Sequence, residues 1–209
     1  MPDEVVFRRL VLALFAAMLG VRTWYAVRHW QLGRRFRLGT EAARREGGVA
    51  LVLRVVLFGG FVAAVIIYAV GPAWLGRFTA AAPAWLRWTG AGVAAASLVM
   101  LVWVHQSLGR FWSVNLELAR DHALVETGPY RWVAHPMYTA FIGYLGGVAL
   151  VSANALIAVP AAGAIGFIVQ RIPREEAMML ERFGDAYRAY RRRTGRLVPR
   201  QLWTPAPRS

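Results

Sequence analysis

Long apolar runs dominate this chain and restrict the folds that it can adopt. A helix needs about 20 apolar residues to cross the hydrocarbon core of a bilayer. Four runs are long enough to enter one, at 7–27, 49–70, 84–105 and 137–170. The fourth is too long for one helix, and Ser152, Ala153 and Asn154 divide it. We therefore expect a hairpin of two spans that turns at Asn154.

The runs together predict an all-α integral membrane protein with about five transmembrane helices. Hydrophobic residues make up 57% of the 209 residues, above the usual share of about half in soluble domains. The length suits a single membrane domain over 1–209, with three N-terminal spans in 1–105. The other half, 106–209, holds the hairpin and a polar tail. The chain contains no cysteine, which excludes disulfides, thiolate nucleophiles and cysteine-ligated metals.

The tail after Pro173 is typical of an amphipathic helix. Proline suits the first helical position. Leu180, Phe183, Tyr187 and Tyr190 recur at spacings of three and four, which makes one apolar stripe, and several arginines accompany them. We expect a C-terminal cytosolic helix that begins at Pro173 and lies on the anionic membrane surface.

Basic residues collect in particular segments. The net charge is +14, and every basic residue is an arginine. Six arginines fall in 28–48 and ten lie from 171 onward, against one in 71–83. A high positive charge could indicate a nucleic-acid binder, but the apolar content favours a membrane protein. Basic residues also collect in the cytoplasmic loops of membrane proteins. We therefore place 28–48, 106–136 and the tail on the cytoplasmic side, although Arg8 and Arg9 oppose an outside N-terminus.

Three polar segments, 108–130, 135–138 and 171–187, fall on the same side in this topology. Segments that converge at one membrane face can form a site between helices. Each also has a structural interpretation: His135 and Pro136 suit a helix start, and acidic residues favour a helix N-terminus. The histidines show no metal-ligand spacing, so we predict no metal site. No dinucleotide fingerprint or serine nucleophile elbow is present.

The order of these motifs along the chain resembles the isoprenylcysteine carboxyl methyltransferase family and the similar phospholipid N-methyltransferases. The motifs cover roughly residues 100–200 and are specific as an ordered set. They are Leu108-Gly109-Arg110-Phe111-Trp112-Ser113, Gly128-Pro129-Tyr130-Arg131, His135-Pro136-x-Tyr138, Arg171-x-Pro173-x-Glu175-Glu176 and Phe183-Gly184-x-x-Tyr187-x-x-Tyr190.

The resemblance implies an S-adenosylmethionine site at the cytoplasmic end of the helices, without a Rossmann domain. It places the cofactor against Gly128, Pro129, Tyr130, His135, Pro136 and Tyr138, with Glu175 and Glu176 of the tail closing the pocket. It also implies a lipidic or isoprenoid methyl acceptor that arrives from the surrounding membrane lipids.

The chain departs from the family pattern at two positions. Ala134 stands where the family usually has an arginine before His-Pro, and Ala140 stands where it usually has a glycine. Either the substrate differs from that of the best-known members, or Arg131 supplies the missing charge.

The resemblance implies carboxyl O-methylation as the expected reaction. A carboxylate nucleophile needs a cation to hold it and no general base at neutral pH. Arg171 is the candidate, since guanidinium binds carboxylate bidentately. Glu175, four residues on, could orient Arg171 or hold the amino group of the cofactor. An amine nucleophile would need a base, for which Glu175 is the first candidate.

Three other functions stay open from the sequence. A phospholipid N-methyltransferase would share the cofactor and the motifs. A membrane reductase of the sterol type would use NADPH and need phosphate-binding cations near the pocket. A non-catalytic membrane scaffold would be consistent with Ala134 and Ala140.

Overall fold

Five long helices make up most of the part of the chain that the structure describes. The computed structural model describes residues 2–31, 48–108 and 124–200. The long helices are α1 (Pro2–Gln31), α3 (Gly48–Val70), α4 (Ala84–Leu108), α5 (Pro136–Ser152) and α6 (Ala155–Arg193), and two short 3-10 helices are η1 (Ala73–Phe78) and η3 (Gly128–Arg131). The described residues contain no strand, only two isolated β-bridges. The expected all-helical architecture is confirmed.

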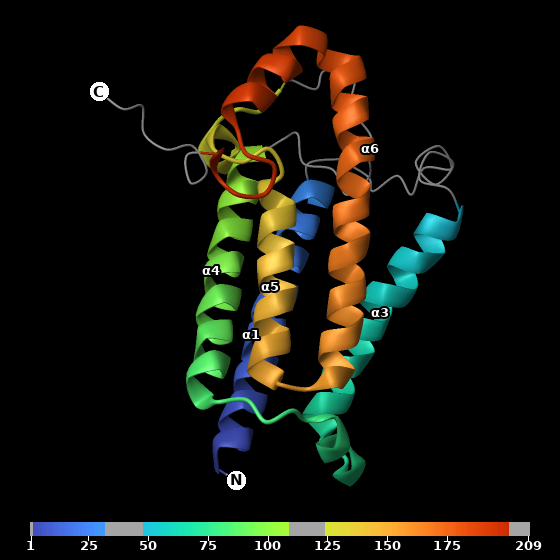
Figure 1. Ribbon diagram of the computed structural model, residues 1–209, viewed down its shortest axis with the longest axis vertical. Helices are drawn as coiled ribbons and strands as arrows, with labels where there is room; N and C mark the ends of the chain where they lie inside the picture. Colours follow the sequence, from blue (N-terminus) through green and yellow to red (C-terminus); the bar gives the residue numbers. More distant parts are fainter. Residues whose placement is uncertain (1, 32–47, 109–123, 201–209) are drawn as a thin grey trace.

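The long helices run in alternating directions along one bundle axis (Figure 1). The N-terminus lies at one end of the bundle. The segment before α5 and the end of α6 lie at the other. Helix α3 leans away from the other helices toward its N-terminal end, as Figure 1 shows.

Three of the five helices, α3, α4 and α6, are long and apolar enough to cross a membrane. Helix α5 is apolar but has only 17 residues, which span about 25 Å of a core about 30 Å thick. Helix α1 covers the expected span 7–27 and carries charged residues along its length. Membrane crossing by α1 and α5, and thus the count of five spans, stays a prediction.

The expected turn at Asn154 is confirmed. Ala153 ends α5 in the left-handed backbone region, with φ 47°. The Asn154 side chain then accepts a hydrogen bond from the backbone N–H of Leu156 at 3.0 Å, which caps α6. Its amide group also donates to Thr79 Oγ1 at 3.0 Å. The hairpin is thereby tied to the segment between α3 and α4.

Helices α4 and α5 pack closely through small residues. A Cβ atom on Gly147 would lie 2.7 Å from the carbonyl oxygen of Gly90 and 2.9 Å from the Cβ of Ala94. One on Gly143 would lie 2.4 Å from Ser97 Oγ. Small residues allow such backbone approach between membrane helices. This contact holds the middle and the C-terminal part of α5 against the N-terminal half of α4.

A buried cation holds together the end of the bundle that contains the N-terminus. Arg87 of α4 is only 5% exposed and donates from Nε to the carbonyl of Val151 at 2.8 Å. Its guanidinium pairs with Glu4 and lies 3.9 Å from the ring centroid of Phe7. Pairing with Glu4 offsets the cost of burying this charge. Through these contacts Arg87 links α1, α4 and α5, which is a structural role.

The tail differs from the sequence-based expectation in where its helix begins. Pro173 lies inside α6, which continues without a new start from the membrane hairpin. The helical path breaks at Gly184 instead, whose φ of 52° and ψ of −122° suit glycine alone. Figure 1 shows that α6 bends over there and returns toward α4 and α5. The expected tail helix is therefore the continuation of α6.

The apolar stripe of the tail also has a different partner from the one expected. Tyr187 and Tyr190 are buried against Ala134, and Phe183 packs against the same cluster. Leu180 is exposed. The two tyrosines thus cover the segment before α5, which contradicts a stripe lying on the membrane surface.

Candidate active site

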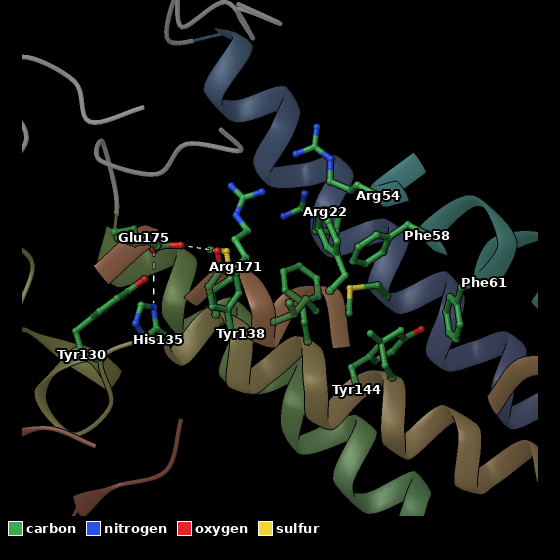
Figure 2. A pocket seen from close by; sticks show the side chains of 18 of the residues that line it. Arg22, Arg54, Phe58, Phe61, Tyr130, His135, Tyr138, Tyr144, Arg171 and Glu175 are labelled. Atoms are coloured by element: carbon green, nitrogen blue, oxygen red, sulfur yellow. Dashed lines mark hydrogen bonds and ion pairs between the residues drawn. The ribbon is translucent and has the colours of Figure 1, made fainter. Parts of the chain in front are cut away.

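A cavity of about 770 Å³ lies inside the bundle toward the end with the polar segments (Figure 2). One face each of α1, α3, α5 and α6 forms its wall, together with residues of 124–135 and the returning end of α6. The volume falls within the range typical of ligand sites, about 300–1,000 Å³. The sequence predicted that 108–130, 135–138 and 171–187 converge. The structure confirms this for the described residues of the first segment, 124–130, and for the other two segments.

Helical spacing explains which side chains reach the cavity. Residues three and four apart share one face of a helix. On α5 these are Tyr138, Phe141 and Leu145, and on α6 they are Ile168, Arg171 and Glu175. On α1 they are Phe15, Met18 and Arg22. Each set is apolar toward the middle of the bundle and polar toward the site end.

Glu175 is the centre of the polar wall. Tyr138 donates a hydrogen bond from its hydroxyl to the Glu175 carboxylate. His135 Nδ1 lies 3.8 Å from the other carboxylate oxygen. The rings of His135 and Tyr138 stack with centroids 5.6 Å apart. Figure 2 shows both residues facing Glu175, so α5 presents an aromatic and hydrogen-bonding surface to an acidic residue of α6.

Tyr130 completes this wall from η3. Burial first, and the negative charge of Glu175 second, raise the pKa of the Tyr130 phenol. The hydroxyl therefore keeps its proton at neutral pH and remains a hydrogen-bond donor. The wall thus combines a carboxylate with neutral aromatic groups.

Glu176 lies behind His135, outside the cavity lining. Its carboxylate accepts hydrogen bonds from Arg196 Nε at 3.0 Å and from another Arg196 nitrogen at 2.6 Å. Arg191 Nε lies 3.2 Å away. His135 Nε2 lies 3.3 Å from Glu176 Oε1. With the carboxylate ionised, Nε2 donates that bond, which leaves Nδ1 facing Glu175.

These contacts fix the charge of Glu176, which lies beyond the apolar stretch of α6 ending near Gln170. Burial raises the pKa of Glu176, but the hydrogen bonds from His135 and Arg196 and the charge of Arg191 outweigh it. The resulting pKa is about 2. Glu176 is therefore an anion at any physiological pH and holds the imidazole in place.

The chain that follows α6 is bound to the segment before α5. The backbone N–H of Ala134 donates to the carbonyl of Gly195 at 2.8 Å, and that of His135 donates to Arg196 at 3.1 Å. The Tyr190 hydroxyl donates to the carbonyl of Tyr130 at 2.8 Å. These bonds hold the returning end of α6 over the cavity. A tail that closes the pocket would need this position.

The structure separates the expected site residues into two groups. Tyr130, His135, Tyr138, Arg171 and Glu175 line the cavity. Gly128, Pro129, Pro136 and Glu176 do not.

The four residues outside the lining support it in different ways. Gly128 has a φ of 60° and packs on α4, where a Cβ atom would lie 2.0 Å from Ser107 Oγ. Pro129 and Pro136 are buried, at the start of η3 and of α5 respectively. Glu176 holds His135. For these residues the described geometry favours positioning over direct contact with a ligand.

The two departures from the family pattern have clear places in the fold. Ala134 is buried under Tyr187 and Tyr190. Ala140 is buried in the main hydrophobic core and does not line the cavity. Arg131, the expected substitute for the missing arginine, lies outside the cavity and stacks on Trp132, with its guanidinium 6.0 Å from the ring centroid. Arg131 therefore does not supply the missing charge to this cavity. Arg191 and Arg196 are the arginines near His135, and both pair with Glu176.

Sequence reasoning missed two cations of the cavity wall, Arg22 and Arg54. Both stand in otherwise apolar stretches, and ionisable residues in such stretches signal function by default. The sequence contained that signal, but it did not show which faces of α1 and α3 meet the cavity. The motif residues 109–113 lie outside the described residues. Within the described part of the chain, no group of three or more metal-ligating side chains occurs.

The fold and the site define a class of helical membrane proteins with a cavity between the helices that is polar at one end and apolar at the other. Within that class, residues 90–181 match the model of the isoprenylcysteine carboxyl methyltransferase (ICMT) family. The matched part holds α5, His135, Tyr138, Arg171, Glu175 and Glu176. The resemblance predicted from the motifs is confirmed over this part of the chain.

Individual relatives agree with the family match. The chain is 34% identical over 88 residues to a protein-S-isoprenylcysteine O-methyltransferase of Tribolium castaneum, which covers 41% of this chain and 31% of that protein. It is 33% identical over 81 residues to the protein of that name in Schizosaccharomyces pombe, covering 38% and 34%. A methanethiol S-methyltransferase of Mycobacterium tuberculosis is 37% identical over 70 residues, covering 34% and 28%. The matches thus span about a third of the length of these relatives.

One solved structure is also similar, that of the eukaryotic intramembrane Ras methyltransferase ICMT. It aligns over 95% of this chain and 93% of its own, with 20% identity and a TM-score of 0.48.

Proposed function

We propose that this protein is an S-adenosylmethionine-dependent methyltransferase that methylates the carboxylate of a lipidic or isoprenoid acceptor. The observation that carries the proposal is the cavity, in which Glu175 and three aromatic rings share a wall with the guanidinium of Arg171. The names of the relatives, a protein-S-isoprenylcysteine O-methyltransferase and a methanethiol S-methyltransferase, support methyl transfer as the reaction.

The residues present fit this cofactor. S-adenosylmethionine supplies a methyl group on a cationic sulfonium and also carries an amino group. Glu175 offers a carboxylate for that amino group, since it already accepts a hydrogen bond from Tyr138 inside the cavity. The rings of Tyr130, His135 and Tyr138 offer faces for an adenine or a cation. Positioning and exclusion of water are the main contributions that such a wall makes.

Arg171 is the residue that would hold the acceptor. It lies one helical turn before Glu175 on the same face of α6, so its side chain enters the cavity beside the polar wall. A guanidinium binds a carboxylate with two parallel hydrogen bonds, which fixes the direction of its lone pairs. The carboxylate is ionised at neutral pH and needs no base. Arg171 therefore orients the carboxylate of the acceptor, which is the nucleophile, and Glu175 holds the cofactor, which is the methyl donor.

The apolar part of the cavity would take the chain of the acceptor. Phe58 and Phe61 of α3, Leu145 of α5 and Ile168 of α6 form this part of the wall. A lipid chain that moves from the bilayer into this part of the cavity stays out of water, so no apolar surface becomes exposed. In a site surrounded by water, part of the chain would be exposed. An acceptor that enters from the bilayer between helices would meet the polar end with its head.

The orientation in the membrane is part of the proposal. The end of the bundle with the site carries Arg171, Arg174, Arg188, Arg191 and Arg196, and basic segments stay in the cytoplasm. Because the chain has no cysteine, a single Arg200→Cys substitution gives a clean probe. Labelling of intact cells by a membrane-impermeant thiol reagent would contradict a cytoplasmic site.

Transfer of radiolabelled methyl groups to N-acetyl-S-farnesylcysteine by the purified full chain tests the activity. We expect a product whose label is released by mild base, as from a methyl ester. A base-stable product on an amine lipid would favour the N-methyltransferase instead.

A second candidate is an NADPH-dependent reductase, and one observation favours it. Arg22 and Arg54 line the cavity, and cations of this kind bind nucleotide phosphates. Binding of NADPH and not of S-adenosylhomocysteine would move the assignment to this class.

A further inference from the structure

A second pocket, of about 410 Å³, lies beside the returning end of α6. Its described lining residues come from the segment around η3 and from the end of α6, which lie at the same end of the bundle (Figure 1). They are Glu126, Arg131, Trp132, Tyr190 and Arg193. Tyr190 also lines the candidate active site, so the two pockets are neighbours that share one side chain.

The two arginines of this pocket differ in their surroundings. Arg193 pairs with the carboxylate of Glu126. Arg131 is exposed, and its guanidinium lies 6.0 Å from the ring centroid of Trp132. Among the described residues, no carboxylate pairs with Arg131. A guanidinium stacked on a ring keeps its N–H donors available at its edge. Glu126 thus neutralises one of two cations, and the described lining keeps a net positive charge.

Two exposed tryptophans indicate where this pocket lies relative to the bilayer. The ring centroid of Trp132 lies 5.6 Å from that of Trp103 on α4, and the two residues are 36% and 42% exposed. Trp103 lies five residues before Leu108, the last residue of α4, which is about 7.5 Å along the helix axis. Helix α4 is long and apolar enough to cross a membrane. Tryptophans collect at the level of the lipid headgroups, so the pocket opens at that level.

We propose that this pocket binds the headgroup phosphate of an anionic membrane phospholipid. Arg131 holds the phosphate, since guanidinium groups bind phosphate oxygens with two hydrogen bonds. The rings of Trp103 and Trp132 contact the first part of the acyl chains. The bound lipid joins η3 to the returning end of α6, and through Tyr190 it helps to keep that end over the active-site cavity. The inference goes beyond the proposed function and does not depend on methyl transfer.

Three probes test the site. Dioctanoyl phosphatidylglycerol is anionic, dioctanoyl phosphatidylcholine has the same chains and phosphate but no net charge, and glycerophosphoglycerol is the anionic headgroup without chains. Native mass spectrometry of the detergent-purified full chain gives the dissociation constants. We expect phosphatidylglycerol to bind about fivefold or more tightly than phosphatidylcholine. Glycerophosphoglycerol should bind more weakly than phosphatidylglycerol, because it lacks the chains that the tryptophan rings contact.

Variants of the cation connect the preference for the anionic lipid to this pocket. Arg131→Gln should remove most of the preference, and Arg131→Lys, which retains the charge, should keep part of it. Arg174→Gln is the matched control, because Arg174 is exposed and does not line the pocket. It removes the same charge from the protein and should keep the preference.

A variant of the carboxylate should have the opposite effect. Glu126→Gln removes the anion that pairs with Arg193, so the lining becomes more positive and the preference for phosphatidylglycerol should increase. The pair with Arg193 is half-exposed and contributes little to stability, so this variant should fold. Glu181→Gln is the control, because Glu181 is exposed and lies outside the lining. It changes the net charge equally and should leave the preference as it is.

The outcomes decide the inference separately from the proposed function. Equal affinity for the two lipids overturns it, and so does a preference that Arg131→Gln retains or that Arg174→Gln loses to the same extent. Binding of glycerophosphoglycerol as tight as that of phosphatidylglycerol would assign the pocket to a soluble phosphate compound, which also overturns it. A preference that depends on Arg131 in a protein that does not bind S-adenosylhomocysteine supports the lipid site and rejects only the methyltransferase.

Discussion

The hydroxyl of Tyr138, in the first turn of α5, donates a hydrogen bond to the carboxylate of Glu175, in the middle of α6. This bond joins two motifs that lie 37 residues apart in the chain. It also aims the carboxylate into the cavity that both residues line. Several consequences of this geometry are open to measurement.

Glu175→Gln should weaken S-adenosylhomocysteine binding by about 10- to 100-fold. The substitution keeps the size of the side chain but removes a charged hydrogen-bond acceptor, which is worth about 1.5–3 kcal/mol. Tyr138→Phe removes only the bond that positions the carboxylate, so its loss should be smaller, about 2- to 10-fold. Calorimetric titration of both variants measures the difference. A Tyr138→Phe protein that binds more weakly than Glu175→Gln would reverse the roles assigned here.

Arg171→Gln should lower kcat/KM for a carboxylate acceptor by about 100-fold or more, since it removes the group that orients the nucleophile. Cofactor affinity should change little. Arg174→Gln is the control, because Arg174 lies three residues further on α6, is exposed and does not line the cavity. It should retain full activity in the methyl-transfer assay. Equal losses of kcat/KM in both variants would show that Arg171 acts only through the net positive charge at this end of the bundle.

The stability of the protein should depend on the charge of Glu176 at acid pH. Its pKa is about 2 in the folded protein, below the ordinary value of 4.5. A depressed carboxylate pKa stabilises the fold fully above about pH 4.5, and the stabilisation is lost as the pH falls through 4.5 toward 2. Thermal unfolding at pH 6, 4 and 3 should show this loss. Glu176→Gln should lower the stability at pH 6 and make it depend less on pH. If the stability of both proteins fell equally with pH, the result would contradict the stabilising role of the ionised Glu176.

Gly147→Ala should destabilise the bundle by about 1–3 kcal/mol, because the new methyl group would meet the backbone of α4. Gly146→Ala, on the neighbouring position of α5, is the matched control. A Cβ atom there has no other atom within 4 Å. We expect this variant to keep its stability or gain up to about 1 kcal/mol. Denaturant unfolding in detergent compares the two, and similar values would refute the close α4–α5 contact.

Much of the fold could be predicted from local signals. The hairpin at Asn154 followed from the length of an apolar run and the polar residues that divide it. The meeting of 124–138 with 171–187 followed from the alternation of the spans. Both predictions rest on properties that a bilayer imposes on any chain, such as helix length.

The path of α6 could not be predicted in the same way. Proline at 173 suits a helix start, yet it is also tolerated inside helices of membrane proteins. Only the packing of Tyr187 and Tyr190 on the segment before α5 shows that the turn falls at Gly184. The pairing of Glu176 with Arg191 and Arg196 depends on that turn and was missed with it.

Arg22 and Arg54 were missed for a different reason. Each stands out in its apolar run, but helical periodicity does not tell which face of α1 or α3 meets a cavity. That depends on how α3 leans away from the bundle, which is a property of the tertiary structure (Figure 1).

The most direct measurement is calorimetric titration of the detergent-purified full chain with S-adenosylhomocysteine, beside NADPH and beside the His135→Ala variant. The cavity geometry predicts saturable binding of S-adenosylhomocysteine by the wild-type protein, no binding of NADPH, and a marked loss of affinity in the variant. Binding of NADPH alone, or of neither ligand by protein shown to be folded, would contradict the methyltransferase assignment.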